Sequence, residues 1–99
     1  MATFITTIKF TAKGIQDIRK SPKRAAEFKT DSKKFGVKVA DIYWTLGEFD
    51  GVVIFDAPDD ETATAAMLHL SSKGFVHTTT ARAFGSSEIE KVIGSLAKK

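Results

Sequence analysis

Histidines and carboxylates are the side chains best suited to metal binding and acid–base catalysis, and the chain has two histidines. His69 and His77 fall in different predicted elements. Neither forms a His-x-x-x-His pair or a facial triad with a carboxylate at a fixed spacing. His69 is expected on the polar side of a helix, at the surface. The sequence therefore predicts no metal site and no cofactor.

Two carboxylates, Glu48 and Asp50, flank Phe49 in a glycine-bounded turn, where both could lie at the mouth of a pocket. Acid–base catalysis needs a carboxyl group with a shifted pKa, which exposed turn residues rarely have. Glycine and aspartate are also the usual residues of tight turns, and we favour this structural interpretation. Gly47 is predicted to hold a backbone conformation that a side chain would strain. Phosphate-binding loops and nucleophile elbows join a strand to a helix, whereas this glycine-bounded turn is expected between two strands. The sequence therefore assigns no catalytic residue.

Charged residues inside predicted strands are the other candidates for function. Lys9 and Arg82 each lie within a strand, where a charged group must reach solvent, a partner or an anion. We predict a ligand site beside the fourth strand, where His77 and Arg82 supply polar contacts, with Lys9 nearby, and Trp44 or Tyr43 supplies an apolar wall. His77 and Arg82 have opposite strand parity, so a bulge or two subunits would be needed. For Lys9 and Arg82, an edge position or an interface salt bridge is the simpler explanation.

Four stretches rich in β-branched and aromatic residues predict strands. They cover Thr3 to Thr11, Val37 to Leu46, Gly51 to Ala57 and Phe75 to Phe84. In the first of them, Phe4, Ile8 and Phe10 share one face, which is expected to join the core.

Helical periodicity fills the gaps between these strands. The first helix begins after Gly14, is interrupted at Ser21-Pro22, where the serine can cap the second part, and ends at Gly36. The second is capped by Asp59 or Asp60. Its expected buried stripe consists of Ala63, Ala66, Met67 and Leu70. A last helix, capped by Ser86 or Ser87, carries Ile89, Val92, Ile93 and Leu96 at amphipathic spacing.

The predicted order is β-α-β-β-α-β plus a C-terminal helix, which is a ferredoxin-like α+β fold with a four-stranded antiparallel sheet. Both main helices cover one face. The other face is not clearly polar, because residues 52–55 form an unbroken apolar run and Tyr43 and Trp44 point to opposite faces. An apolar sheet face usually packs on another sheet or on another subunit. The sequence predicts one domain over residues 1–99 that forms a homodimer or a higher assembly of dimers.

Composition sets the class of protein. The 99 residues include 42% hydrophobic and 27% charged residues, as in ordinary globular domains. The absence of cysteine excludes disulfides and thiolate chemistry. No signal-peptide pattern and no bilayer-length apolar run are found, so a cytoplasmic location without membrane contact is predicted. The net charge of +3 comes from scattered bases among acids, without the interleaved aromatics of single-strand binding, and no nucleic-acid partner is predicted.

Several segments occur together in a specific order. They are Ser21-Pro22-Lys23-Arg24, residues 43–50 (Tyr-Trp-Thr-Leu-Gly-Glu-Phe-Asp), Ala57-Pro58-Asp59-Asp60 and Thr78-Thr79-Thr80. Together they resemble the GYD-domain family over residues 1–84. The resemblance implies a dimeric α+β barrel, in which two ferredoxin-like sheets pack face to face, and it implies no established general activity. Phe49 stands where the name-giving tyrosine is usual, so a role that needs a phenol hydroxyl does not carry over.

Three functions are compatible with these features. We favour a small homodimeric or oligomeric binding module that holds a small organic ligand or mediates protein association, because it needs nothing beyond the apolar sheet. The alternative is a cofactor-independent enzyme, similar to the monooxygenases and isomerases among dimeric α+β barrels, with His77, Tyr43 or an acid handling protons. RNA binding lacks the Arg/Lys-Gly-Phe-x-Phe signature of RNA-recognition domains.

Overall fold

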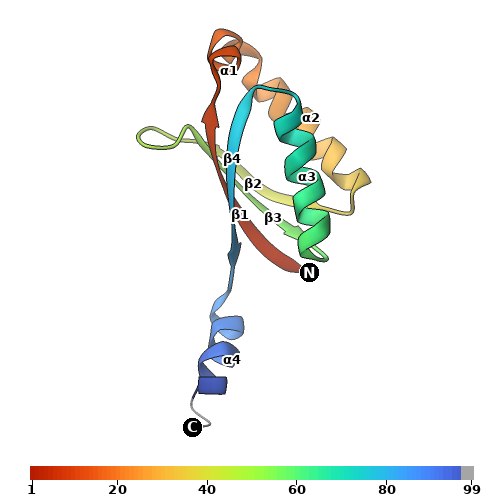
Figure 1. Cartoon of the computed structure of the whole chain (residues 1–99), viewed down its shortest axis with the longest axis vertical. Coiled ribbons are helices and arrows are strands. Elements are labelled where there is room, and N and C mark those ends of the chain that lie inside the picture. The colour runs from red at the N-terminus through yellow and green to blue at the C-terminus, as the bar shows by residue number, and fades with distance from the viewer. Residues whose placement is uncertain (97–99) are drawn as a thin grey trace.

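The computed structural model describes residues 1–96. Its elements are β1 (Ala2–Phe10), α1 (Ala12–Gln16), η1 (Ile18–Lys20), α2 (Ser21–Lys34), β2 (Lys38–Trp44), β3 (Gly51–Ala57), α3 (Asp60–Ser72), β4 (Val76–Ala83) and α4 (Ser86–Leu96). The strands form one antiparallel sheet in the order β2-β3-β1-β4. In Figure 1, α2 and α3 lie on one side of this sheet and α4 extends past its end. This is the ferredoxin-like α+β arrangement that the sequence predicts.

A bulge in β2 decides which of its side chains face the helices. The register between β2 and β3 shifts between Val39 and Asp41. As a result, Val39 and Trp44, which differ in strand parity, both face the helix layer, and the Tyr43 ring faces the other side. β2 also ends at Trp44, two residues before the predicted end, because residues 45–50 form the loop to β3.

The helix starts use their capping residues differently. The carboxylate of Asp59 accepts the N–H of Thr62 over 2.8 Å and caps α3, as predicted. The predicted serine cap of α2 is wrong, because α2 begins at Ser21 itself and no side chain of residues 1–96 caps it. The Ser21 hydroxyl instead accepts a hydrogen bond from the indole of Trp44. The Ser21 hydroxyl therefore takes part in a tertiary hydrogen bond and not in a local helix cap.

The core lies between the helix layer and the sheet. It contains Phe4, Phe28, Val37, Val39, Val53, Phe55, Ala57, Ala63, Ala66 and Met67. The rings of Phe4 and Phe55 stack at 5.3 Å between centroids. Thr6 is fully buried on the same face, where its hydroxyl bonds to Thr80 Oγ1 over 2.8 Å and to Met67 Sδ over 3.3 Å. These bonds satisfy the buried hydroxyl, as an interior polar group requires.

The opposite face of the sheet, which we call the open face, has no helix over it within residues 1–96. Strand register brings four apolar side chains together at its centre: Ile5, Tyr43, Val52 and Ile54. Around them lie threonines and Ala81 of the flanking strands. The apolar run at residues 52–55 is therefore divided between the core and the open face.

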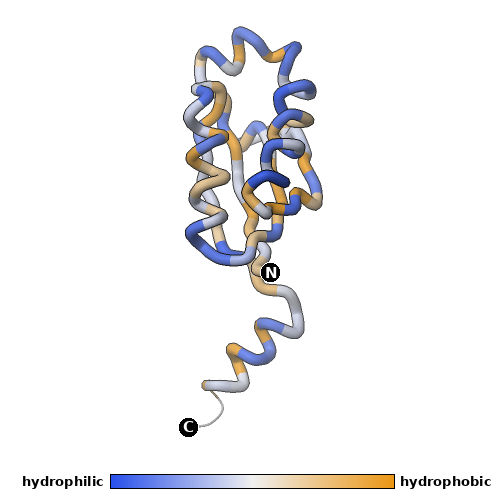
Figure 2. Tube along the Cα trace, turned by 90° about the vertical axis from the view of Figure 1, so that its right-hand side faces the viewer, coloured by the Kyte–Doolittle hydropathy of each residue, from blue (hydrophilic) through white to orange (hydrophobic). Residues whose placement is uncertain are grey.

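The last helix, α4, stands apart from the two layers. It continues beyond the end of β4, and the molecule measures 54 × 31 × 18 Å along its principal axes as a result. Apolar and polar segments alternate along α4 (Figure 2), and none of its residues is buried. Across the described residues 1–96, no helix combines the length and the apolar character needed to cross a bilayer.

Candidate functional site

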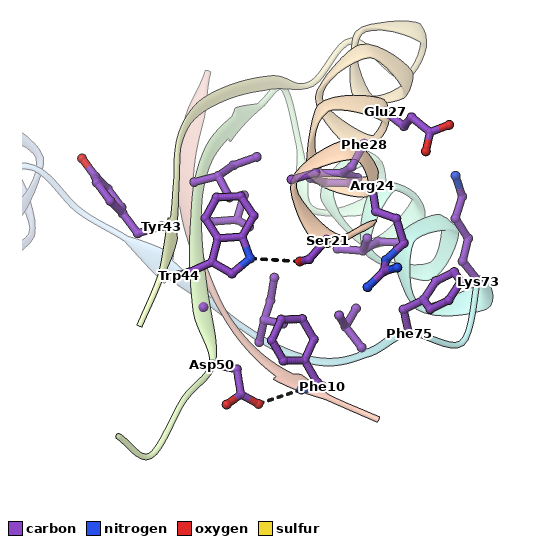
Figure 3. A pocket seen from close by; sticks show the side chains of 17 residues that line it. Phe10, Ser21, Arg24, Glu27, Phe28, Tyr43, Trp44, Asp50, Lys73 and Phe75 are labelled. Atoms are coloured by element: carbon purple, nitrogen blue, oxygen red, sulfur yellow. Dashed lines mark hydrogen bonds between the residues drawn. The ribbon is translucent and has the colours of Figure 1, made fainter. Parts of the chain in front are cut away.

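A cavity of about 140 Å³ lies between the sheet and the start of α2. Figure 3 shows its lining from close by. The walls are mostly apolar and include Ile8, Phe10, Phe28, Ile42, Trp44, Val53, Leu70 and Phe75. Polar groups enter from Ser21, Arg24, Asp50 and Lys73. An apolar cavity with a few convergent polar groups is the usual composition of a small-molecule site.

Trp44 forms one wall of the cavity and is held by α2. Its indole Nε1 donates a hydrogen bond to Ser21 Oγ over 2.9 Å. This bond joins the last residue of β2 to the first residue of α2 and fixes the plane of the indole. The neighbouring Tyr43 borders the cavity, but its ring points away from it, toward the open face (Figure 3).

Arg24 brings a positive charge to the cavity. Its guanidinium lies 4.2 Å from the centre of the Phe75 ring and donates to the carbonyl of Asp17 over 3.0 Å. Lys13 also lies over Phe75, at 4.6 Å from Nζ to the ring centre. The Phe75 ring is thus an apolar wall of the cavity that makes cation–π contacts with Arg24 and Lys13.

Asp50 connects the loop of residues 45–50 to the end of β1. Its Oδ2 accepts the N–H of Phe10 over 2.8 Å, and its own N–H donates to the carbonyl of Ile8 over 2.8 Å. Glu48 is exposed. Asp50 therefore extends the β1–β3 pairing past Gly51, and its carboxylate satisfies a backbone donor beside the cavity.

The structure divides the five residues of the predicted ligand site between the two faces of the sheet. Trp44 lies in the cavity. Lys9 and His77 are partners in the β1–β4 register on the open face, where Tyr43 also projects. Arg82 faces the helices at the other end of β4, in a groove between β4 and α3. β4 pairs with β1 without a bulge, so His77 and Arg82 keep their opposite parity within one chain. A ligand site that uses both His77 and Arg82 would need two subunits, and it stays a prediction.

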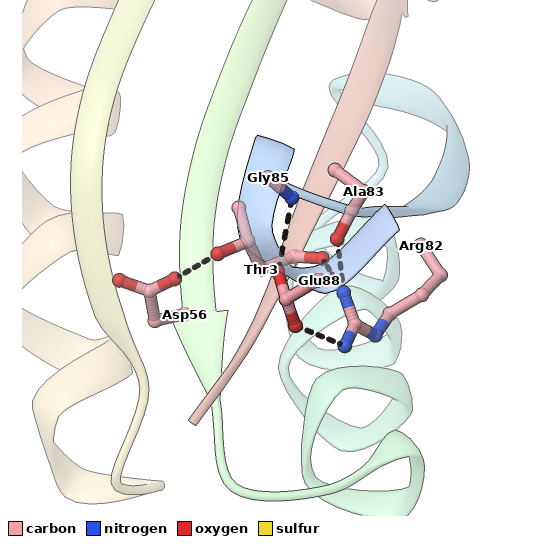
Figure 4. A network of polar contacts seen from close by, with 6 residues as sticks. All are labelled: Thr3, Asp56, Arg82, Ala83, Gly85 and Glu88. Atoms are coloured by element: carbon pink, nitrogen blue, oxygen red, sulfur yellow. Dashed lines mark hydrogen bonds and ion pairs between the residues drawn. The ribbon is translucent and has the colours of Figure 1, made fainter. Parts of the chain in front are cut away.

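The guanidinium of Arg82 already has protein partners (Figure 4). Nη1 donates to the carbonyls of Thr3, at 3.3 Å, and of Ala83, and Nη2 pairs with Glu88 Oε2 at 3.1 Å. The Phe84 ring lies 4.4 Å from the guanidinium carbon. These contacts connect β4 to the first turn of α4. They give Arg82 a positioning role for that helix.

The two histidines lie apart. Nε2 of His69 lies 3.3 Å from Asp31 Oδ2 and links α3 to α2, whereas His77 is exposed on β4. Within residues 1–96, no group of three or more histidine, aspartate or glutamate side chains is arranged to hold a metal ion.

A family model described as the GYD domain matches residues 4–93 of the sequence. The chain belongs to the GYD-domain family. A curated relative of this GYD domain is the glutamine synthetase and cystathionine beta-lyase binding protein of Thermus thermophilus. The two are 37% identical over 90 residues, which cover 90% of this chain and 95% of the relative.

Solved structures support the fold of this GYD domain. MtbAldR superposes with a TM-score of 0.61 at 16% identity, over 86% of this chain and 54% of its own. The GYD domain thus spans about half the length of MtbAldR. TTHA0845, a protein from Thermus thermophilus, gives a TM-score of 0.57 at 20% identity, over 87% of this chain and 96% of its own.

The cavity of the GYD domain includes residues that sequence patterns did not select. The sequence predicts Ser21 as a helix cap and Asp50 as a turn residue, and it leaves Arg24 among the scattered basic residues. All three lie beside Trp44 because α2 crosses over the β2–β3 end of the sheet. The Ser21-Pro22-Lys23-Arg24 and Gly47-Glu48-Phe49-Asp50 segments, 26 positions apart in the sequence, could have indicated this, since each contributes to the same cavity.

Proposed function

We propose that this GYD domain is a small homodimeric binding module in which two copies pair through their open faces and the assembled dimer binds other proteins. The observation that carries the proposal is the apolar centre of the open face. Ile5 is 37% exposed and Tyr43 53% exposed there, beside the half-buried Val52 and Ile54. Fully burying an aliphatic side chain contributes about 1.5–3 kcal/mol, so covering this cluster in both copies favours association.

Pairing of the open faces would also bring together three members of the predicted ligand site. Lys9, Tyr43 and His77 of both copies would line the space between the two sheets. A small organic ligand held there would meet apolar walls and a few polar groups. Arg82 stays outside this space, because it faces the helix layer of its own subunit.

The nature of the protein partner is proposed from the relative. That protein is named for binding glutamine synthetase and cystathionine beta-lyase, and it matches nearly the full length of this GYD domain. We propose that this chain likewise binds enzymes of this kind.

Light scattering coupled to size exclusion tests the homodimer. We expect a dimer mass for the wild type and a monomer for Ile54→Asp, because the introduced carboxylate would be buried between the sheets. Ala65→Asp is the matched control, since it places the same charge on the exposed side of α3. A monomeric wild type at micromolar concentration would overturn the proposal.

Binding of enzymes is tested with purified proteins. Glutamine synthetase and cystathionine beta-lyase from the organism that produces this GYD domain are passed over the immobilised domain. An unrelated enzyme of similar charge serves as the control. Saturable binding of either named enzyme supports the proposal. Binding equal to that of the control contradicts it.

The cavity beside Trp44 supports a second candidate function, the holding of a small organic ligand within each subunit. Its apolar walls suit an aromatic ring, and Arg24 and Lys73 at its edge suit an anionic substituent. Trp44 is the single tryptophan, so its fluorescence reports directly on the cavity. Benzoate is a suitable probe: we expect it to quench Trp44 in the wild type and in Lys29→Ala, but weakly in Arg24→Ala. Equal quenching in all three proteins would exclude this site.

A further inference from the structure

The apolar side of α4 is uncovered. Ile89, Val92, Ile93 and Leu96 follow the i, i+3, i+4, i+7 spacing of a helix face that packs on something. Their exposed fractions range from 40% to 66%. Four large apolar side chains on one side of a helix are more than the scattered apolar residues of an ordinary surface.

Helix α4 is also too short to be stable in isolation. It has 11 residues, and isolated helices of this length are marginal in water. Its start is fixed, because Glu88 accepts the N–H of Gly85 and pairs with Arg82 (Figure 4). These contacts direct the helix past the end of its own sheet, where no other element of residues 1–96 covers it. Packing on another molecule would supply the stability that a helix of this length lacks.

A second uncovered apolar feature lies at the opposite end of the sheet. In the loop of residues 45–50, Leu46 is fully exposed and Phe49 is 41% exposed. Figure 1 shows this loop between β2 and β3, projecting away from the helix layer. It joins β3 at Gly51, which pairs with Ile8 of β1, whereas β4 ends at Ala83, which pairs with Thr3. The two pairs are five residues apart on β1, roughly 17 Å along the strand. The loop is thus out of reach of α4 of the same chain.

We propose that α4 is an arm that packs its apolar side against the loop of residues 45–50 in a second copy of this chain. The inference rests on the proposed homodimer. Two open faces can pair about a two-fold axis that lies between the sheets and runs perpendicular to the strands. The end of one sheet that carries α4 then lies over the end of the other sheet that carries the loop. α4 of each copy then meets the loop of the other, and the two contacts are equivalent, as an isologous dimer requires.

The small number of apolar side chains on the open face supports this occupant. Stable interfaces bury about 800 Å² per partner and involve about 20–30 residues a side. Four apolar side chains among threonines are a small part of such an interface. Two reciprocal contacts between α4 and the loop extend it at both ends. The polar side of α4 mixes Glu90 with Lys91, without the excess of lysine and arginine that is typical of helices on membrane surfaces.

The absence of cysteine allows a direct test by disulfide cross-linking. Leu46→Cys and Ile93→Cys chains are produced separately, mixed so that subunits exchange, and oxidised. We expect a cross-linked dimer from the mixture and little from either variant alone, because the contact joins the loop of one copy to α4 of the other. Lys91→Cys replaces Ile93→Cys in the control, since residue 91 lies on the opposite side of α4.

The outcomes separate this inference from the homodimer. Strong cross-linking of the Leu46–Ile93 mixture, at least fivefold above the Leu46–Lys91 mixture, supports the exchanged arm. Equal yields in the two mixtures, with a dimer mass for the wild type by light scattering, overturn the arm and leave the homodimer standing. A monomeric wild type overturns both. Cross-linking of the Ile93→Cys chain with itself also overturns the proposal, because it would place the two α4 helices together.

Discussion

The indole N–H of Trp44 donates to the hydroxyl of Ser21 over 2.9 Å, and this bond joins the end of β2 to the start of α2 beside the cavity. Ser32, further along α2, is the informative contrast. It is 1% exposed, and its hydroxyl has no hydrogen-bond partner among the described residues. One serine of α2 therefore makes a tertiary hydrogen bond, and the other buries a hydroxyl without one.

Ser21→Ala is expected to lower the free energy of unfolding by about 0.5–1.5 kcal/mol, the usual net contribution of a hydrogen bond. Trp44 is half exposed, so water can partly replace the lost acceptor and the lower part of this range is expected. Urea unfolding followed by the fluorescence of Trp44 measures the change. Ser32→Ala is the matched control, and it should be neutral or stabilising, because it removes an unsatisfied polar group and places a better helix former in α2. An equal loss in both variants would mean that the Trp44 bond contributes nothing specific.

Asp50→Ala is expected to destabilise the protein by about 1–3 kcal/mol, because it leaves the N–H of Phe10 without its acceptor in a half-buried position. Asp50→Asn keeps a carbonyl oxygen and should lose less. Thermal unfolding of each variant gives the comparison. Glu48→Ala removes the other carboxylate of the loop, which is exposed, and should stay within about 0.5 kcal/mol of the wild type. If Glu48→Ala were as damaging as Asp50→Ala, the loop acids would have a role that the Phe10 contact does not explain.

Gly47→Val is expected to lower the free energy of unfolding by about 1–3 kcal/mol. Gly47 has a φ of +122°, and a residue with a side chain is strained in this conformation. Apart from the two neighbouring residues of the chain, no atom of residues 1–96 lies within 4 Å of the position that a Cβ would take there, so the cost is conformational and not steric. Gly94→Ala is the control in α4, where a Cβ also meets no atom of the described residues and alanine favours the helix. The Tm should fall for Gly47→Val and hold or rise for Gly94→Ala. An unchanged Tm for Gly47→Val would contradict the prediction.

Local patterns in the sequence predicted the elements of the fold, because β-branched runs, proline and capping aspartates act on near neighbours. They could not decide between Trp44 and Tyr43 as the wall of the cavity. The bulge after Val39 reverses the parity of β2, and nothing in Val-Ala-Asp-Ile marks that position. The role of Arg24 could not be predicted either. Arg24 and Phe75 are 51 residues apart in the sequence, and their contact depends on how α2 crosses the sheet. Such contacts are set by tertiary packing and leave no periodic pattern.

The carboxylate of Asp31 connects α2 to α3 through two partners. Its Oδ2 lies 3.3 Å from Nε2 of His69 and 3.3 Å from Nζ of Lys73. The hydrogen bond from His69, followed by that from Lys73, holds the pKa of Asp31 below its ordinary value of 3.8. A carboxyl group whose pKa is depressed by folding stabilises the folded state above its unfolded-state pKa. That stabilisation is lost as the pH falls through the folded-state pKa.

Asp31→Asn is therefore expected to lower the Tm at pH 7, and the difference from the wild type should shrink as the pH falls below about 3.8, once the carboxylate takes up its proton. The effect should be modest and should weaken with added salt, because the three side chains are partly exposed. Thermal melts between pH 2.5 and 7 at two salt concentrations measure it. Glu90→Gln removes one negative charge from the polar side of α4 and should follow the wild type throughout. A difference between Asp31→Asn and the wild type that stays constant down to pH 2.5 would show that the asparagine disturbs the packing of α2 on α3, and that the charge of Asp31 is not what joins them.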